Sequence, residues 1–100
     1  MFFEYHCWID GENDNLKFTI LTQKIDSINC ANFEYALIKL AEFHNIVLDM
    51  KNVEYVSSMG IGVLVNIYKT IVKCGKSFKI INVSDTVKKV ISVTKIPFSS

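Results

Sequence analysis

The sequence contains no arginine, a single proline and only four glycines. Its eleven basic residues are all lysines, spread from Lys17 to Lys95, and Lys88 and Lys89 form the only adjacent pair. Nucleic-acid binders usually gather basic residues on one face and rely on arginine, whose planar head contacts phosphates and base edges with two hydrogen bonds. The formal net charge is only +1. We therefore do not expect a nucleic-acid partner.

The cysteines are too few and too dispersed for a disulfide framework or a metal site. Cys7, Cys30 and Cys74 are an odd number and include no CxxC pair, and no histidine stands at zinc-ligand spacing. The two histidines, His6 and His44, belong to no recognisable motif. We expect three buried or half-buried thiols in a reducing cytosol, and neither a metal nor a bound cofactor.

Segments that would direct the chain to a membrane are also lacking. The longest uncharged, mostly apolar stretch, residues 55–68, is too short to span a bilayer and contains Ser, Gly and Asn. The N-terminus has no basic segment followed by an apolar core, so we do not expect a signal peptide. These features predict a soluble, cytoplasmic protein.

Common catalytic motifs are missing as well. An esterase nucleophile elbow needs Gly-x-Ser-x-Gly. Gly60 stands two residues after Ser58, but the position two residues before it is Val56 and not glycine. The phosphate-binding loop Gly-x-x-x-x-Gly-Lys-Ser/Thr does not occur, and Gly60-Ile61-Gly62 alone is a weak phosphate signal. We therefore do not expect an enzyme.

The residues that are present fit one globular domain spanning residues 1–100. Half of the 100 residues are apolar and 21% are charged, which is typical of a folded chain with its own core. Residues 2–9 and 16–22 favour strands, and a cluster of turn formers between them predicts a β-hairpin. We expect its aromatic residues to pack on the first helix, although an exposed aromatic patch is the alternative: Phe2, Phe3, Tyr5 and Trp8.

Beyond the hairpin, predicted helices and strands alternate. Apolar residues three or four apart predict three helices, namely residues 27–42 after a cap at Asp26 or Ser27, residues 61–74, and residues 85–96 between Ser84 and Pro97. Short apolar runs predict strands at residues 45–50, 53–56 and 77–83. For the first helix the predicted buried face contains Ile28, Ala31, Tyr35 and Ile38, with Phe33, Leu37 and Leu40 as further candidates.

This order predicts an α/β fold. Strands that alternate with helices form parallel crossovers, and the leading hairpin adds an antiparallel edge. We therefore expect a four-stranded mixed sheet packed with about three helices.

The segment that leads into the second helix is the most informative. A buried strand ends at Asp49, a short connection ends in Ser57 and Ser58, and the helix then begins with Gly60 and Gly62. Helix N-termini favour anions, so this position tolerates a phosphoserine, and the added charge would change a binding surface. The simpler interpretation is that one serine only caps the helix and the glycines only aid packing, and the residues alone favour it.

Residues 55–64, Tyr-Val-Ser-Ser-Met-Gly-Ile-Gly-Val-Leu, resemble without a gap the signature of STAS domains, found in anti-sigma factor antagonists and in the cytoplasmic tails of sulphate transporters. Residues 73–78 and 81–90 resemble the later turn, strand and helix of this family. The resemblance extends over nearly the whole chain. It implies a STAS-like domain and a role in protein binding.

The resemblance also implies which residues act. Ser58 matches the serine that a partner kinase phosphorylates, with Ser57 as the second candidate. Asp26 matches an acid that helps shape the kinase-binding patch, and Asp49 matches the acid at the end of the central strand. The partner-binding set that the resemblance implies consists of these two acids and residues 57–61, Ser57, Ser58, Met59, Gly60 and Ile61. Ser57 itself stands where the family usually carries an acid.

Two functions remain open. In the first, the chain is an anti-sigma factor antagonist that binds an anti-sigma serine kinase and so releases a sigma factor. Phosphorylation of Ser58 would end binding, and a serine phosphatase would restore it, while ATP and magnesium would belong to the kinase. In the second, the chain is a phosphorylation-independent scaffold or accessory subunit of a transport or signalling complex. The serine in register favours the first, and the missing acid favours the second. The sequence leaves the oligomeric state open.

Overall fold

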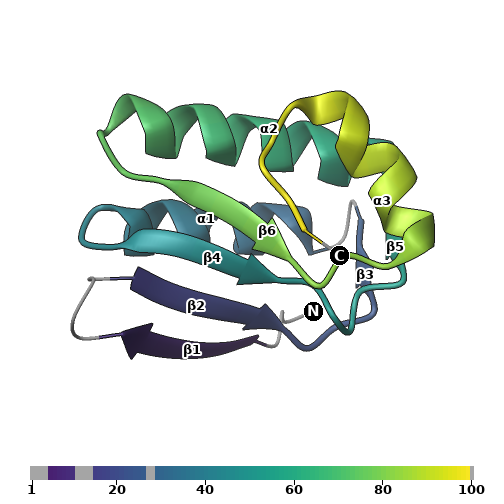
Figure 1. Cartoon of the computed structure of the whole chain (residues 1–100), viewed down its shortest axis with the longest axis horizontal. Helices are drawn as coiled ribbons and strands as arrows, with labels where there is room; N and C mark the ends of the chain where they lie inside the picture. The colour runs from purple at the N-terminus through teal and green to yellow at the C-terminus, as the bar shows by residue number, and fades with distance from the viewer. Residues whose placement is uncertain (1–4, 11–14, 27–28, 100) are drawn as a thin grey trace.

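The computed structural model describes residues 5–10, 15–26 and 29–99. Its main sheet has the order β1-β2-β4-β6 (Figure 1). β1 (Tyr5–Asp10) is antiparallel to β2 (Asn15–Ile20), and β4 (Asn45–Asp49) lies parallel to both β2 and β6 (Phe78–Ile81). The predicted four-stranded mixed sheet with its antiparallel hairpin is therefore confirmed, and β1 ends at Asp10, one residue later than predicted. Phe2 and Phe3 lie outside the described residues.

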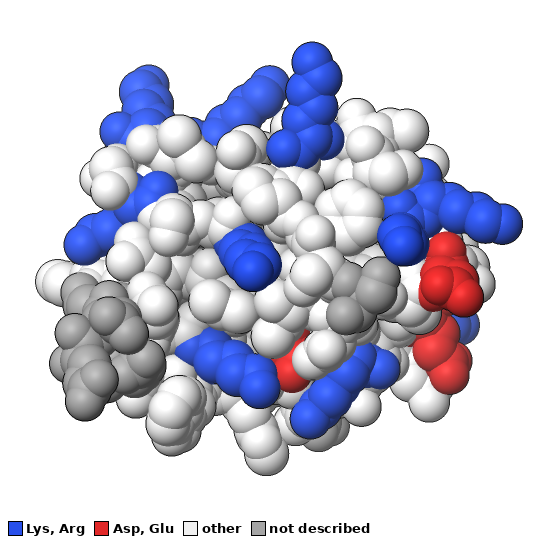
Figure 2. Space-filling model, viewed as in Figure 1, with Lys and Arg blue, Asp and Glu red and all other residues white. Residues whose placement is uncertain are grey.

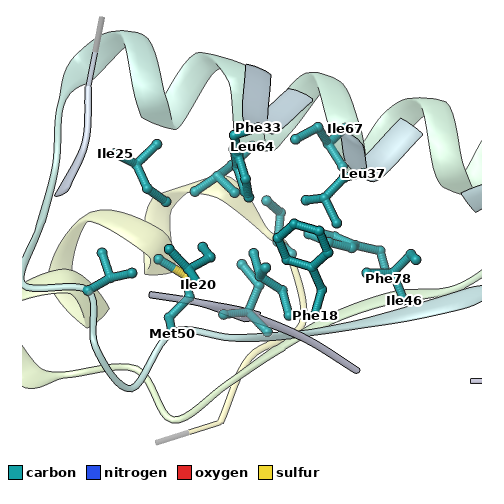
Figure 3. Close-up of a cluster of buried hydrophobic side chains, with 14 of the residues drawn as sticks. Phe18, Ile20, Ile25, Phe33, Leu37, Ile46, Met50, Leu64, Ile67 and Phe78 are labelled. Atoms are coloured by element: carbon teal, nitrogen blue, oxygen red, sulfur yellow. The ribbon is translucent and has the colours of Figure 1, made fainter. Parts of the chain in front are cut away.

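Three helices follow the strands, as the sequence predicts: α1 (Cys30–Ala41), α2 (Ser58–Lys73) and α3 (Asp85–Ile91). A short 3-10 helix, η1 (Ser92–Thr94), continues from α3. The core lies between α1, α2 and one face of the sheet (Figure 3). Alternation in β2 creates that face, because Leu16, Phe18 and Ile20 are buried while Lys17 and Thr19 on the other face are half-buried.

The buried face of α1 differs from the predicted one. Cys30, Phe33, Leu37 and Ala41 are buried, whereas Tyr35 is 68% exposed. Ala31 is also exposed and Ile38 only half-buried, while Ile28 lies outside the described residues. Spacings of three and four fit two apolar stripes on this helix, and the sheet covers the stripe that contains two of the further candidates, Phe33 and Leu37. α1 also begins later than predicted, with Asn29 in the N-cap position.

The two described aromatic residues of β1, Tyr5 and Trp8, are exposed. Trp8 is 66% exposed, and Tyr5 is exposed although its ring stacks on Phe18 with centroids 4.5 Å apart. The described part of β1 therefore presents an open surface, and the expectation of burial is wrong for these two residues. Two of the thiols are exposed as well, since only Cys30 is buried while Cys7 and Cys74 reach solvent.

The C-terminal segment confirms one predicted cap and corrects one predicted helix end. The Ser84 hydroxyl accepts a hydrogen bond from Val87 N at 3.3 Å and so caps α3. Pro97 does not end this helix, because the helical turns stop at Thr94 and Lys95 adopts φ 65°. Pro97 lies beside β6, where its carbonyl accepts a hydrogen bond from Ile80 N at 2.9 Å.

A second, two-stranded sheet forms where the sequence predicts only one short strand. β3 (Lys24–Ile25) pairs in parallel with β5 (Tyr55–Val56), and each contains two residues. Two residues are too few for alternation to reveal a strand. This small sheet positions the candidate site.

Candidate functional site

The β3–β5 pair brings Asp26 and Ser57 together from distant parts of the chain. Ile25 pairs with Val56, and Ser57 N donates a hydrogen bond to the Ile25 carbonyl at 2.8 Å. The next residue of each strand, Asp26 and Ser57, therefore leaves the sheet at the same point. Glu54 N extends this pairing on the other side, with a hydrogen bond of 2.7 Å to the Gln23 carbonyl.

Asn29 holds the Asp26 segment in place, and the sequence prediction did not include it. Its side-chain oxygen accepts a hydrogen bond from Asp26 N at 3.0 Å, and its side-chain nitrogen donates to the Lys24 carbonyl at 2.8 Å. The residue is buried, so these bonds also satisfy its polar atoms. A polar residue directly before a helix is a sequence signal for a structural hydrogen-bonding role. The sequence does not show, however, that Asn29 bonds the backbone of residues 24 and 26 that precede it.

The two serines at the start of α2 have different roles in the structure. Ser57 is the N-cap, since its hydroxyl accepts a hydrogen bond from Gly60 N at 3.0 Å. This bond satisfies one of the free N–H groups of the first turn. Ser58 is the first helical residue and is exposed, and no other described residue hydrogen-bonds its hydroxyl. Ser58 is therefore the accessible hydroxyl.

The two glycines of this helix also differ. A Cβ atom on Gly60 would lie 2.8 Å from the Ile25 carbonyl oxygen and 2.9 Å from Val56 Cγ1, closer than real contacts allow. Gly60 thus lets α2 pack directly on the β3–β5 pair. A Cβ atom on Gly62 would have no neighbour within 4 Å. Gly60 is therefore required for packing within the chain, whereas the position of Gly62 has space for a side chain.

An outward-facing surface results, which we call the helix-start surface: Asp26, Ser57, Ser58, Met59 and Gly62. Met59 is 57% exposed although it is a large apolar side chain. Ile61, which the sequence also places in the partner-binding set, is half-buried and packs against the core. Gly60 is buried below the surface.

Asp49 does not belong to this surface, because its side chain is fully buried, with 0% exposure. Its Oδ1 accepts hydrogen bonds from Lys51 N at 3.0 Å and from Asn82 Nδ2 at 3.1 Å. Its Oδ2 lies 3.5 Å from Lys17 Nζ and has no hydrogen bond from a described residue. Asp49 therefore joins the ends of β4 and β6, and Asn82 adopts φ 57° beside it.

The segment between Asp49 and Ser57 is fixed by bonds to the main sheet. Met50 N donates to the Ile81 carbonyl at 3.0 Å, and Asn52 Nδ2 donates to the Ile20 carbonyl at 3.0 Å. Val53, in the same segment, is buried. Asp49 thus lies at the start of a segment that is hydrogen-bonded to the main sheet and leads to the helix-start surface.

Features of other kinds of site are not found in the described part of the chain. Its His, Cys, Asp and Glu residues form no group of three that could hold a metal ion. None of its helices is long and apolar enough to cross a membrane. Figure 2 shows lysines spread over the visible face of the molecule and around its outline, with no single dense basic cluster.

The comparisons with known proteins agree with this geometry. A family model described as "STAS domain" matches residues 11–99. No curated protein matches the chain. A Thermotoga maritima protein proposed to be an anti-sigma factor antagonist is 22% identical, with a TM-score of 0.79 over 96% of this chain and 86% of that chain.

Three further solved structures show where else this fold occurs. The anti-sigma factor antagonist SpoIIAA, unphosphorylated, is 12% identical with a TM-score of 0.74 over 97% of this chain and 87% of that one. Its phosphorylated form, from Bacillus, is 10% identical with the same TM-score of 0.74 over 98% and 90%. The murine anion transporter Slc26a9 is 25% identical with a TM-score of 0.68 over 81% of this chain and only 14% of the transporter. The fold is shared at low identity.

Proposed function

Because this chain belongs to the STAS domain family, we propose that it is an anti-sigma factor antagonist, a protein-binding switch controlled by phosphorylation of Ser58. It acts by binding and not by catalysis. Its partners are an anti-sigma factor serine kinase and a serine phosphatase, and it works in the cytoplasm. The observation that carries this proposal is the division of roles between Ser57, which caps α2, and Ser58, whose hydroxyl is exposed.

Phosphorylation of Ser58 fits the start of α2 without disturbing the fold. Gly60 N is already bonded by the Ser57 hydroxyl, so the cap stays in place when Ser58 is modified. The positive end of the helix dipole favours the added phosphate. A phosphate on Ser57 would instead replace the hydroxyl that caps the helix. Ser58 is therefore the preferred acceptor.

The same phosphate changes what the helix-start surface can bind. Unmodified, this surface presents an exposed apolar side chain, Met59, beside an open glycine, Gly62, which allows a partner close to the backbone. Phosphorylation places a charge of about −1.5 to −2 next to Met59 and close to the Asp26 segment. A partner that buries Met59 must then desolvate this charge, which opposes binding.

The first test is mass spectrometry of the protein purified from its own cells, with a phosphatase-treated sample as control. We expect one phosphate on the peptide that contains Ser57 and Ser58, located on Ser58. Ser57→Ala, which removes the cap at a cost of about 1 kcal/mol, should still be phosphorylated. Loss of the phosphate in Ser57→Ala but not in Ser58→Ala would contradict the assignment.

The second test uses three baits in the same lysate: the unmodified protein, Ser58→Ala and Ser58→Asp. We expect the first two to capture a serine kinase that also binds a sigma factor, and Ser58→Asp to capture at least tenfold less. Equal capture by all three would argue against the switch.

A second candidate function is supported by the similarity to a domain within the murine transporter. In that case the chain is a phosphorylation-independent scaffold or accessory subunit of a transport or signalling complex. The two functions differ in the capture experiment, because a scaffold would bind its partner equally well with Ser58→Asp.

A further inference from the structure

The two edges of the main sheet differ in whether the chain covers them. At the β6 edge, Ile80 N donates to the Pro97 carbonyl and Ser99 N donates to the Ile80 carbonyl, both at 2.9 Å. Ile80 and Phe98 form a parallel bridge there. At the opposite edge, no described strand lies beyond β1 (Figure 1). One edge is therefore covered by the chain itself, whereas no described residue pairs along the other, which we call the open edge.

Apart from Asp10 at the end of β1, the open edge lacks the features by which proteins normally keep edge strands from pairing. β1 is paired with β2 over all six of its residues without a bulge. Residues 5–9, Tyr-His-Cys-Trp-Ile, include no proline, lysine or acid. Edge strands are usually protected by charges, prolines or bulges, because their unpaired N–H and C=O groups accept another strand. Both Trp8 and Ile9 are exposed on this strand.

We propose that β1 is a homodimer interface, at which two copies of this chain pair their β1 strands antiparallel and join two sheets into one. A two-fold axis through Cys7 places Tyr5 of each copy opposite Ile9 of the other. It also places His6 opposite Trp8. Aromatic and β-branched residues in such cross-strand pairs stabilise a sheet, and no described side chain of this strand brings a like charge into the contact.

A second copy is favoured over an open series of copies because, among the described residues, the main sheet has one covered edge and one open edge. The pairing uses the same strand in both copies, so the contact is self-complementary and the assembly closes at two. The covered β6 edge cannot extend it further. β1 also lies on the far side of the sheet from α2 in Figure 1, so the dimer leaves the helix-start surface free.

The short strand sets the expected affinity. Pairing five described residues a side, Tyr5 to Ile9, buries less than the roughly 1,200 Å² of a standard interface. We therefore expect a weak dimer, with a dissociation constant on the order of micromolar. The proposal is independent of phosphorylation at Ser58.

Sedimentation velocity over a range of concentrations tests the dimer. We expect the mass to rise from the monomer value of 11.4 kDa toward twice that value. Trp8→Glu should raise the dissociation constant at least tenfold. Within one copy the new carboxylate faces Lys17 across the hairpin, which preserves β1, but in the dimer two carboxylates lie on a diagonal about 7–8 Å apart.

The matched control is Tyr35→Glu. Tyr35 is as exposed as Trp8, at 68% against 66%, and also lies near a lysine, Lys39, but it belongs to α1. Its substitution should change the dissociation constant by less than about twofold, since surface changes outside an interface have little effect. A monomer at every concentration up to about 1 mM, well above the weak affinities of small interfaces, would overturn the proposal. So would a Trp8→Glu dimer as tight as the unmodified one.

Disulfide trapping gives a second, independent readout. Antiparallel pairing about Cys7 places the two Cys7 Cα atoms about 4.5–5.5 Å apart, within disulfide range. Partial burial raises the pKa of the Cys7 thiol, so the oxidation needs mildly alkaline buffer. Copper-phenanthroline takes the two electrons, and the two thiol protons go to solvent.

Two variants distinguish crosslinking through Cys7 from crosslinking through Cys74, the two exposed cysteines; Cys30 is buried. Cys74→Ser, which keeps Cys7, should form a covalent dimer at concentrations where sedimentation shows association. Cys7→Ser, which keeps Cys74, should form at least tenfold less covalent dimer than Cys74→Ser under the same conditions. Equal crosslinking through Cys74 would place the contact elsewhere and overturn the proposal.

Discussion

The start of α2 faces solvent, whereas the end of β4 is folded into the interior. Ser58 and Met59 are exposed at the first, and at the second Asp49 is fully buried between Lys17, Lys51 and Asn82. The family resemblance places residues of both regions in one partner-binding set. The structure separates them, because only the start of α2 can contact a partner through its side chains.

This difference shows how a site can depend on residues that never touch a partner. The Asp49 carboxylate orders the connection that begins at Lys51, and that connection leads to β5 and to the cap at Ser57. The two hydrogen bonds that Oδ1 accepts, from Lys51 N and Asn82 Nδ2, hold the backbone there in one arrangement. We therefore interpret Asp49 as a positioning residue and the helix-start surface as the contacting part.

Two methionines, Met50 and Met59, give the largest contrast between the regions. Met50, directly after β4, is 1% exposed, and Met59 is 57% exposed. Met50→Ala should lower the free energy of unfolding by about 2–5 kcal/mol, because it leaves a cavity in the core. Met59→Ala should change it by less than about 0.5 kcal/mol.

Partner binding should respond in the opposite order. Met59→Ala should weaken capture of the partner about tenfold, whereas folded Met50→Ala protein should bind normally, since an exposed apolar anchor contributes mainly at an interface. Urea unfolding and quantitative capture at a temperature where both variants are folded provide the two measurements. A stability loss in Met59→Ala as large as that in Met50→Ala would remove the distinction.

Gly60 tests whether the buried side of the first turn of α2 contributes to folding and not to partner binding. Gly60→Val should lower the free energy of unfolding by about 1–3 kcal/mol, because its side chain would collide with the Ile25 carbonyl and Val56. Gly62→Val, at an open position of the same helix, is the control and should cost little. Urea unfolding compares the two. If Gly60→Val weakened binding but not folding, the glycine would serve the partner and not the packing.

Asp49 tests the positioning role. Asp49→Ala leaves Lys51 N and Asn82 Nδ2 without their acceptor, which should cost about 1–3 kcal/mol of stability. Asp49→Asn keeps an oxygen that can accept both bonds and should cost less. Thermal or urea unfolding gives the stabilities. A drop in partner affinity with unchanged stability would instead indicate direct contact by Asp49.

Much of the fold follows from patterns that the sequence displays directly. Alternation of Leu16, Phe18 and Ile20 identifies β2 and its buried face, and Ser84 marks the cap of α3. For α1, spacing identifies the helix but not its buried face, because two apolar stripes satisfy the same period and only the position of the sheet decides between them.

The site was harder to predict for a different reason. β3 and β5 are too short for a periodic signal, yet their pairing is what places Asp26 beside Ser57. The burial of Asp49 depends on Lys17 and Asn82, which are far away in the sequence. A charged residue at a strand end is normally expected at the surface, since burial of an unpartnered charge is costly. Only the tertiary structure shows its partners.

Gly62 gives the smallest and most specific test of the comparison. Glycine inside a helix costs about 0.5–1 kcal/mol relative to alanine, and no contact within the chain explains it here, because a Cβ would meet nothing within 4 Å. Gly62→Ala should therefore raise the free energy of unfolding by that amount. If the open position serves close approach by a partner, the same variant should bind the partner more weakly. A variant that is more stable and binds equally well would show that the partner does not approach Gly62 closely, and the helix-start surface would then end before Gly62.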